Sequence, residues 1–205
     1  MRDVVLAPGL WMPGAAMALL AARLARAGYA PRIFAYRGRS PFAANRERLA
    51  RFALETLRGR AAHYIGHSLG GLLVLEMLNH HPEVPVASVV LLGAPVRGCL
   101  AGRRFGTRRL GRWMMGACGE CWQERDAAWT RPAPLGVIAG TVALGLGRAI
   151  GGRLPGDNDG VVRVDETIVR GMTAQALVPT AHSVLILSGA VDRLVQRFLT
   201  RASFE

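Results

Sequence analysis

The sequence predicts an α/β fold in which helices flank a mostly parallel central sheet. Short apolar runs rich in β-branched residues alternate with longer segments whose apolar residues recur at helical spacing. Such alternation is typical of βαβ units, and βαβ units build parallel sheets. The chain has 205 residues, 51% of them hydrophobic, which is enough for one sizeable core. We therefore expect residues 1–205 to form a single domain.

The predicted elements follow one another with short connections. The expected strands are residues 3–7, 31–36, a short run ending at 65, 86–92, 134–139 and 175–178. The expected helices are residues 17–28, 43–57, a stretch that begins near 69, 142–150 and 184–199. The last of these is amphipathic, with an apolar stripe that ends at Phe198. Only residues 97–131 interrupt the alternation.

The run Gly66-His67-Ser68-Leu69-Gly70-Gly71 stands between a predicted strand and a predicted helix. A strand that turns sharply into a helix needs glycines on either side of the central residue, because a Cβ there would collide with the adjoining elements. Ser68 is therefore expected at an exposed tip. This G-x-S-x-G pattern in its strand–turn–helix context resembles the nucleophile elbow of the α/β-hydrolase superfamily.

The resemblance spans essentially the whole chain and is closest to small bacterial lipases and the group similar to GPI inositol-deacylases. Gly93-Ala94-Pro95 after the fourth strand is similar to the Gly-Thr-Pro of lipase-like relatives. The resemblance implies an α/β-hydrolase fold with a short cap-like insertion, and a serine nucleophile at position 68. It implies no cofactor and no metal.

A serine hydroxyl needs a base to take its proton, and the base needs a carboxylate to orient it. This fold places the base late in the chain, and His182 is the histidine that follows the last predicted strand. His67 beside the nucleophile is expected to point elsewhere.

Two aspartates, Asp157 and Asp159, lie in the loop where the acid is expected. The related lipases carry their acid in an Asp-Gly or Asp-x-Val-Val motif about two dozen residues before the histidine. Asp159-Gly160-Val161-Val162 matches that pattern, with His182 twenty-three positions later. The resemblance therefore favours Asp159, with Asp157 as the alternative.

The oxyanion that forms in acyl transfer needs two fixed donors, which backbone amides supply. One is expected from Leu69, directly after the nucleophile. The other is expected from Leu10, in the Pro8-Gly9-Leu10-Trp11 loop after the first strand. Related proteins commonly read His-Gly in this loop, so Pro8 replaces a side chain that braces it.

The segment 97–131 is predicted to be a cap over the acyl site. It holds eight arginines against three acids. Leu110, Trp113, Met114 and Ala117 recur at helical spacing, which predicts a basic helix with one apolar side. That side either packs on the sheet or contacts substrate. Trp11, Trp113 and Met114 are the candidate substrate-binding side chains.

The net charge is +12, and all 26 basic residues are arginine. They are spread from Arg2 to Arg201, and the chain is also rich in alanine and glycine, as is typical of a GC-rich genome. We therefore expect no nucleic-acid partner, although the charge favours peripheral contact with an anionic membrane surface.

Proline and glycine pairs interrupt the apolar stretch at residues 4–25, so no signal peptide or membrane span is expected and the predicted location is cytoplasmic. Cys118 and Cys121 form a lone C-x-x-C without a second ligand pair, which does not favour metal binding.

These features predict a serine hydrolase that cleaves carboxylic esters of small molecules or lipids through an acyl-enzyme on Ser68, His182 and Asp159. A thioesterase, a lactonase or an inositol deacylase would use the same residues. A non-catalytic interaction protein on a hydrolase scaffold, or a binder of polyanions or membrane surfaces, is the alternative from a different class.

Overall fold

The computed structural model describes residues 2–145 and 152–205, and it contains one six-stranded sheet. The strand order is β2-β1-β3-β4-β5-β6, and every neighbouring pair is parallel. The predicted α/β fold class is therefore confirmed. The strands are β1 (Arg2–Ala7), β2 (Tyr29–Ile33), β3 (Ala62–His67), β4 (Val86–Leu92), β5 (Leu135–Gly140) and β6 (Ala174–Val178).

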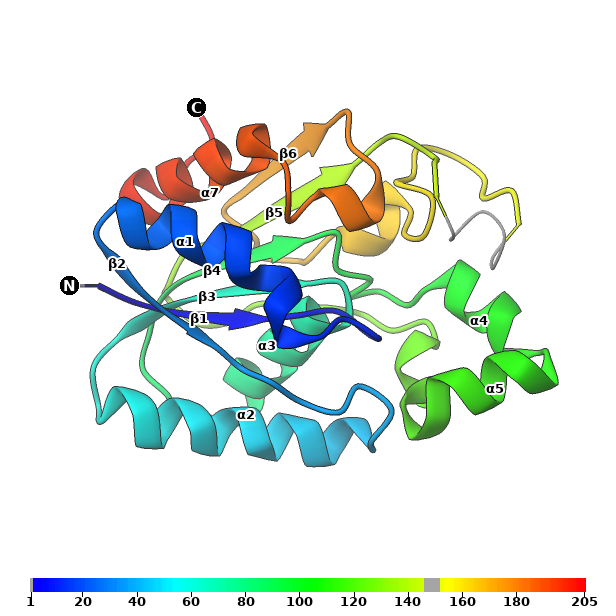
Figure 1. Ribbon diagram of the computed structural model, residues 1–205, viewed down its shortest axis with the longest axis horizontal. Helices are drawn as coiled ribbons and strands as arrows, with labels where there is room; N and C mark the ends of the chain where they lie inside the picture. The colour runs from blue at the N-terminus through cyan, green and yellow to red at the C-terminus, as the bar shows by residue number, and fades with distance from the viewer. Residues whose placement is uncertain (1, 146–151) are drawn as a thin grey trace.

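Helices cover both faces of the sheet, with α1 and α7 on one face and α2 and α3 on the other (Figure 1). The α-helices are α1 (Ala18–Arg26), α2 (Phe42–Leu57), α3 (Leu69–His80), α4 (Leu100–Gly106), α5 (Arg109–Met115) and α7 (Gly189–Arg201). Short 3-10 helices are η1 (Gly14–Met17), η2 (Gly116–Trp122), η3 (Val164–Thr167) and η4 (His182–Val184). Within the described residues, no helix combines the length and the apolar character that crossing a bilayer requires.

Two predicted helices differ from the structure. The last helix begins at Gly189 rather than at residue 184, because Ser188 caps it: its Oγ accepts a hydrogen bond from the Val191 amide at 3.4 Å. Residues 182–184 form η4 instead. Of the helix predicted at 142–150, residues 142–145 are not helical, and the remainder falls outside the described residues.

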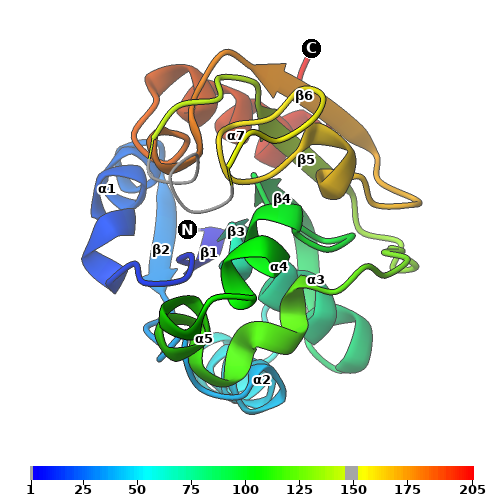
Figure 2. The same cartoon turned by 90° about the vertical axis from the view of Figure 1, so that its right-hand side faces the viewer.

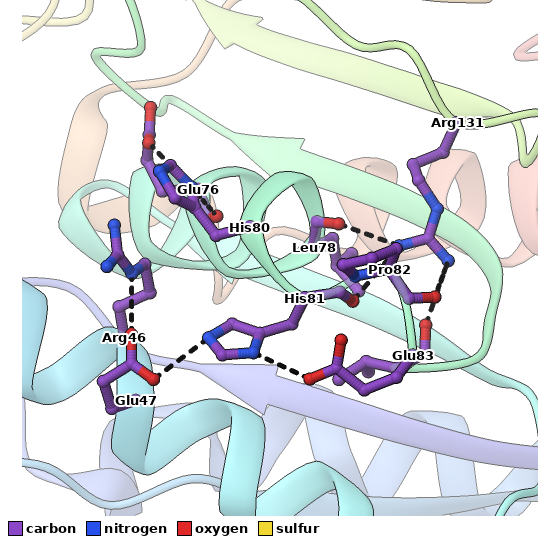
Figure 3. Close-up of polar contacts among 10 residues, drawn as sticks. Arg46, Glu47, Glu76, Leu78, His80, His81, Pro82, Glu83 and Arg131 are labelled. Atoms are coloured by element: carbon purple, nitrogen blue, oxygen red, sulfur yellow. Dashed lines mark hydrogen bonds and ion pairs between the residues drawn. The ribbon is translucent and has the colours of Figure 1, made fainter.

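The carboxyl end of α3 is capped by Arg131 (Figure 3). Its guanidinium donates hydrogen bonds to the carbonyl oxygens of Leu78, His81, Pro82 and Val84, at distances between 2.8 and 3.4 Å. The last carbonyls of a helix have no partner within the helix, so a cation placed there satisfies them and complements the helix dipole. This cap fixes α3, and the opposite end of α3 begins directly after Ser68.

The segment that carries α4, α5 and η2 lies beyond the carboxyl ends of the strands (Figures 1 and 2). Its base is closed by two backbone hydrogen bonds, from Cys99 N to Trp122 O at 3.0 Å and from Arg125 N to Arg97 O at 3.3 Å. The buried Glu166 carboxylate also accepts the Leu100 amide at 2.7 Å. The first turn of α4 is therefore joined to the loop that follows β5.

Candidate active site

Ser68 lies at the sharp turn between β3 and α3, where it lines a cavity and is only 9% exposed, so the exposed tip predicted from the sequence is wrong. Its backbone has φ 54° and ψ −125°, a region that residues with a side chain rarely adopt. The Ser68 amide donates to Leu92 O at 2.9 Å, which holds the turn against β4. Strain of this kind persists only where the surroundings impose it, and it is concentrated at functional sites.

The glycines around Ser68 are required by close backbone contacts. A Cβ on Gly66 would lie 2.4 Å from the Gly71 Cα, and a Cβ on Gly70 would lie 2.2 Å from the carbonyl oxygen of Ala7. Neither backbone could move away without shifting β1 or α3. The glycine pattern in the sequence therefore has a steric cause in the packing of α3 on the sheet.

His182 and Asp159 form a buried hydrogen-bonded pair. The His182 Nδ1 lies 2.7 Å from Asp159 Oδ2, and both residues are buried. The other carboxylate oxygen, Oδ1, accepts the backbone amides of Val161 at 3.0 Å and Val162 at 2.7 Å. Because an ionised carboxylate only accepts, His182 carries its proton on Nδ1 and leaves Nε2 free to accept.

The two candidate aspartates lie in different environments. Asp159 is 1% exposed, and its backbone carbonyl also accepts the His182 amide at 2.9 Å. The side chain of Asp157 is exposed and makes no hydrogen bond or ion pair to any residue that the structure describes. The geometry therefore joins Asp159, rather than Asp157, to His182.

The loop after β1 approaches Ser68 closely. A Cβ on Gly9 would lie 3.1 Å from the Ser68 Cβ, so a larger residue there would push the loop away. Leu10 lines the same cavity as Ser68, and the amide of Leu69 lies in the first turn of α3, where amides have no partner within the helix.

Tyr36 braces this loop in a way that the sequence did not reveal. Its hydroxyl donates to Pro8 O at 2.8 Å, and burial raises the pKa of the phenol well above its usual value. A partly buried hydroxyl that keeps its proton holds the carbonyl of Pro8 in place. No local sequence signal connects Tyr36 with Pro8, because they are brought together only by the pairing of β1 with β2.

His67 lines the cavity beside Ser68, although its side chain was expected to point elsewhere. Its Nε2 lies 3.0 Å from the carbonyl oxygen of His182, and the two rings are 4.8 Å apart. Burial, reinforced by the nearby His182, lowers the pKa of His67 to about 3, so its ring is neutral. The carbonyl can only accept, which puts the proton of His67 on Nε2. The sequence feature that could have indicated a place in the site is the position of His67 directly before Ser68.

Ser68, His67 and His182 open into one mainly apolar cavity of about 180 Å³. Trp11 and Met12 form part of its wall. The segment 97–131 supplies a further part of the wall, through Cys99, Ala101, Gly102, Phe105, Met115 and Trp122. This cavity provides an apolar space next to a serine and an imidazole.

Trp113 and Met114 do not line the cavity. The side chain of Trp113 is 66% exposed, and its ring lies under the Arg39 guanidinium at 5.0 Å. Met114 contacts the cavity wall only through its backbone, because its carbonyl oxygen accepts a hydrogen bond from the indole N–H of Trp11 at 2.9 Å. Of the three predicted substrate-binding side chains, only Trp11 lies in the cavity wall.

Residues 4–204 match the family model described as "Alpha/beta hydrolase family". The comparison with curated proteins gives no match.

Solved structures with a similar fold include the Bacillus licheniformis lipase BlEst2. Its mature form has a TM-score of 0.76 at 17% identity, over 97% of this chain and 91% of that one. Its propeptide form has a TM-score of 0.77 at 19% identity, and this chain spans only half of its length (97% of this chain, 50% of that one). The RedJ thioesterase of Streptomyces coelicolor has a TM-score of 0.65 at 17% identity, over 97% and 89% of the two chains.

Proposed function

The chain belongs to the alpha/beta hydrolase family, and from that premise we propose that it is a serine hydrolase that cleaves carboxylic esters through an acyl-enzyme. The observation that carries the proposal is the buried contact of His182 Nδ1 with Asp159 Oδ2 at 2.7 Å, in a cavity that also contains Ser68. This contact sets the tautomer that a general base needs.

In the proposed reaction, Ser68 Oγ attacks the acyl carbonyl while His182 Nε2 takes its proton. Asp159 stabilises the imidazolium that forms, and the amides of Leu10 and Leu69 donate to the oxyanion. The tetrahedral intermediate collapses as His182 returns the proton to the departing alcohol. Water then enters, gives a proton to His182 and releases the acid by the same steps in reverse.

We assign His67 a positioning role in this reaction. Its Nε2–H bonds to the His182 carbonyl, while the His182 amide bonds to Asp159 O. The backbone of the base is therefore held on both sides, once by the residue next to the nucleophile and once by the acid. Such support keeps reacting groups within the small distance that efficient proton transfer requires.

The apolar wall supports an apolar acyl group as the part of the substrate that enters the cavity. A volume of about 180 Å³ is below the range of about 300–1,000 Å³ typical of sites for drug-sized ligands. The proposal therefore favours acyl groups of modest length. A panel of p-nitrophenyl esters from acetate to palmitate is expected to give its highest kcat/KM between these ends.

Thioester cleavage is the second candidate, because the fold is also similar to that of the RedJ thioesterase. The same residues would act on either substrate. An oxygen ester and a thioester of the same acyl group, compared by kcat/KM, separate the two activities.

A fluorophosphonate probe tests the nucleophile directly. The wild-type protein and the variant Ser183→Ala, which removes another serine of the cavity wall, should be labelled, whereas Ser68→Ala should not. Ser68→Ala and His182→Ala should each lower kcat by about three orders of magnitude or more. Labelling of Ser68→Ala, or near-wild-type turnover in either variant, would refute the assignment and favour a non-catalytic protein.

A further inference from the structure

The outer side of α5 exposes large apolar side chains beside the cavity. Leu110 is 62% exposed and Trp113 is 66% exposed, while the same helix buries Gly111 and Met115. The sequence left open whether the apolar side of this helix packs on the sheet. In the structure Leu110 and Trp113 face away from the core, so packing does not account for them. Figure 2 shows α5 on the side of the molecule beyond the strand ends.

This surface continues into the cavity through Trp11. The Trp11 side chain lines the cavity and is also 45% exposed. Its ring meets that of Phe105, another wall residue, edge to face at 6.0 Å, and its indole N–H bonds to the carbonyl of Met114 in α5. A molecule resting on α5 would therefore lie next to the cavity mouth.

The same surface is strongly basic. Arg108 and Arg109 are exposed, and neither side chain has an acidic partner among the described residues. Of the three acids in the segment, Glu124 pairs with Arg103. Asp126 pairs with Arg170 from outside the segment, and Glu120 forms no ion pair with a described residue, so no acid of the segment neutralises Arg108 or Arg109 by direct contact.

We propose that this surface, defined as Trp11, Leu110, Trp113, Arg108 and Arg109, seats the protein on an anionic lipid bilayer. Tryptophan and leucine enter the boundary between headgroups and acyl chains, and arginines bind lipid phosphates. The inference rests on the proposed function and deepens it, because the enzyme would take apolar esters that partition into the bilayer surface directly into the cavity.

Other occupants fit the surface less well. A nucleic acid would match the arginines but would leave Leu110 and Trp113 against a polar phosphate backbone. A second copy of the chain would bring two surfaces of the same charge together.

Vesicle cosedimentation of Ser68→Ala protein tests the inference without lipid hydrolysis. We expect binding to vesicles of phosphatidylglycerol and phosphatidylcholine, little binding to pure phosphatidylcholine, and release by salt at about 0.5 M. Adding Arg108→Gln and Arg109→Gln should weaken binding about 30-fold, because each arginine near an anionic surface contributes about fivefold. Leu110→Ser with Trp113→Ser should also weaken it.

Matched controls come from other faces of the molecule. Arg26→Gln with Arg51→Gln removes the same charge from α1 and α2, and Leu177→Ser removes a 54% exposed leucine from β6. These controls should bind as the parent does. Equal losses in the controls and in the α5 variants would overturn the inference, because binding would then depend on total charge or general hydrophobicity.

Two further measurements separate the outcomes. In protein that retains Ser68, the double variant Arg108→Gln with Arg109→Gln should hydrolyse a soluble ester such as p-nitrophenyl butyrate at the wild-type rate. Hydrolysis of the soluble ester without vesicle binding would refute the membrane surface and leave the proposed function intact. Vesicle binding without hydrolysis of the soluble ester would refute the proposed function alone. The inference would also be overturned if the protein formed dimers that Leu110→Ser disperses, or if it bound duplex DNA as tightly as it binds the vesicles.

Discussion

Replacing Asp159 by asparagine should reverse the proton arrangement of His182, the proposed general base. Asp159 Oδ1 accepts two backbone amides, from Val161 and Val162, and only an oxygen can keep those bonds. The asparagine oxygen therefore stays in that position and its NH₂ group faces His182 Nδ1. Nδ1 must then accept, so the proton moves to Nε2, which keeps no lone pair to take the Ser68 proton in the proposed reaction.

A base in the wrong tautomer lowers kcat by about 10⁴-fold, equivalent to about 5 kcal/mol of activation free energy. The fold should persist, because both backbone bonds to Oδ1 remain. The matched control is Asp157→Asn, which changes an exposed carboxylate two residues away and should keep kcat within about twofold. Turnover of p-nitrophenyl butyrate and thermal melting, measured on the same preparations, give both quantities.

A kcat of Asp159→Asn within about tenfold of wild type, with an unchanged melt, would refute this reasoning. If Asp157→Asn were the damaging variant, the acid would be the upstream residue. A large fall in melting temperature for Asp159→Asn would instead show that the charge of the carboxylate stabilises the turn.

Two other histidines give separate predictions. His67→Leu removes the donor to the His182 carbonyl, so kcat should fall about tenfold, as for one lost hydrogen bond, while KM stays nearly constant. His67→Gln should restore part of the lost kcat. An unchanged kcat in His67→Leu would exclude the positioning role. His81 contacts Glu83 at 2.9 Å and Glu47 at 3.1 Å (Figure 3), which raises its pKa above 6.5. Its stabilising contribution is therefore complete below about pH 6.5 and lost as pH rises through the raised pKa. His81→Gln should thus lower Tm more at about pH 6 than at about pH 9, and an equal difference at both would count against the linkage.

The sequence predicted best where a local pattern has one structural meaning. Residues 86–92 were expected as a strand and form β4 with those bounds. The glycines around Ser68 predicted a strand–turn–helix, because only that geometry needs them on both sides. The start of α7 was misplaced since the apolar stripe continues through residues 184–187, whereas the capping bond of Ser188 decides where the helix begins.

What the sequence could not predict depends on contacts between distant residues. The bond from Tyr36 to Pro8 exists because β1 and β2 pair, and neither residue signals the other. The apolar spacing of Leu110 and Trp113 predicted a helix with one apolar side, but periodicity does not say which side the rest of the chain covers. For the same reason Phe105, Met115 and Trp122 could not be recognised as cavity wall.

The excursion between Cys99 and Trp122 leaves and re-enters the fold at a single point, where the two residues are bonded backbone to backbone. The chain entropy of closing this loop grows only with the logarithm of its length, so doubling the loop would cost about 0.6 kcal/mol. The entropic cost of exchanging the excursion for one of another length is therefore small. Under the proposed function, other segments joined between the same two ends would change the apolar wall of the cavity, provided that they replaced the bond from Trp11 to the Met114 carbonyl.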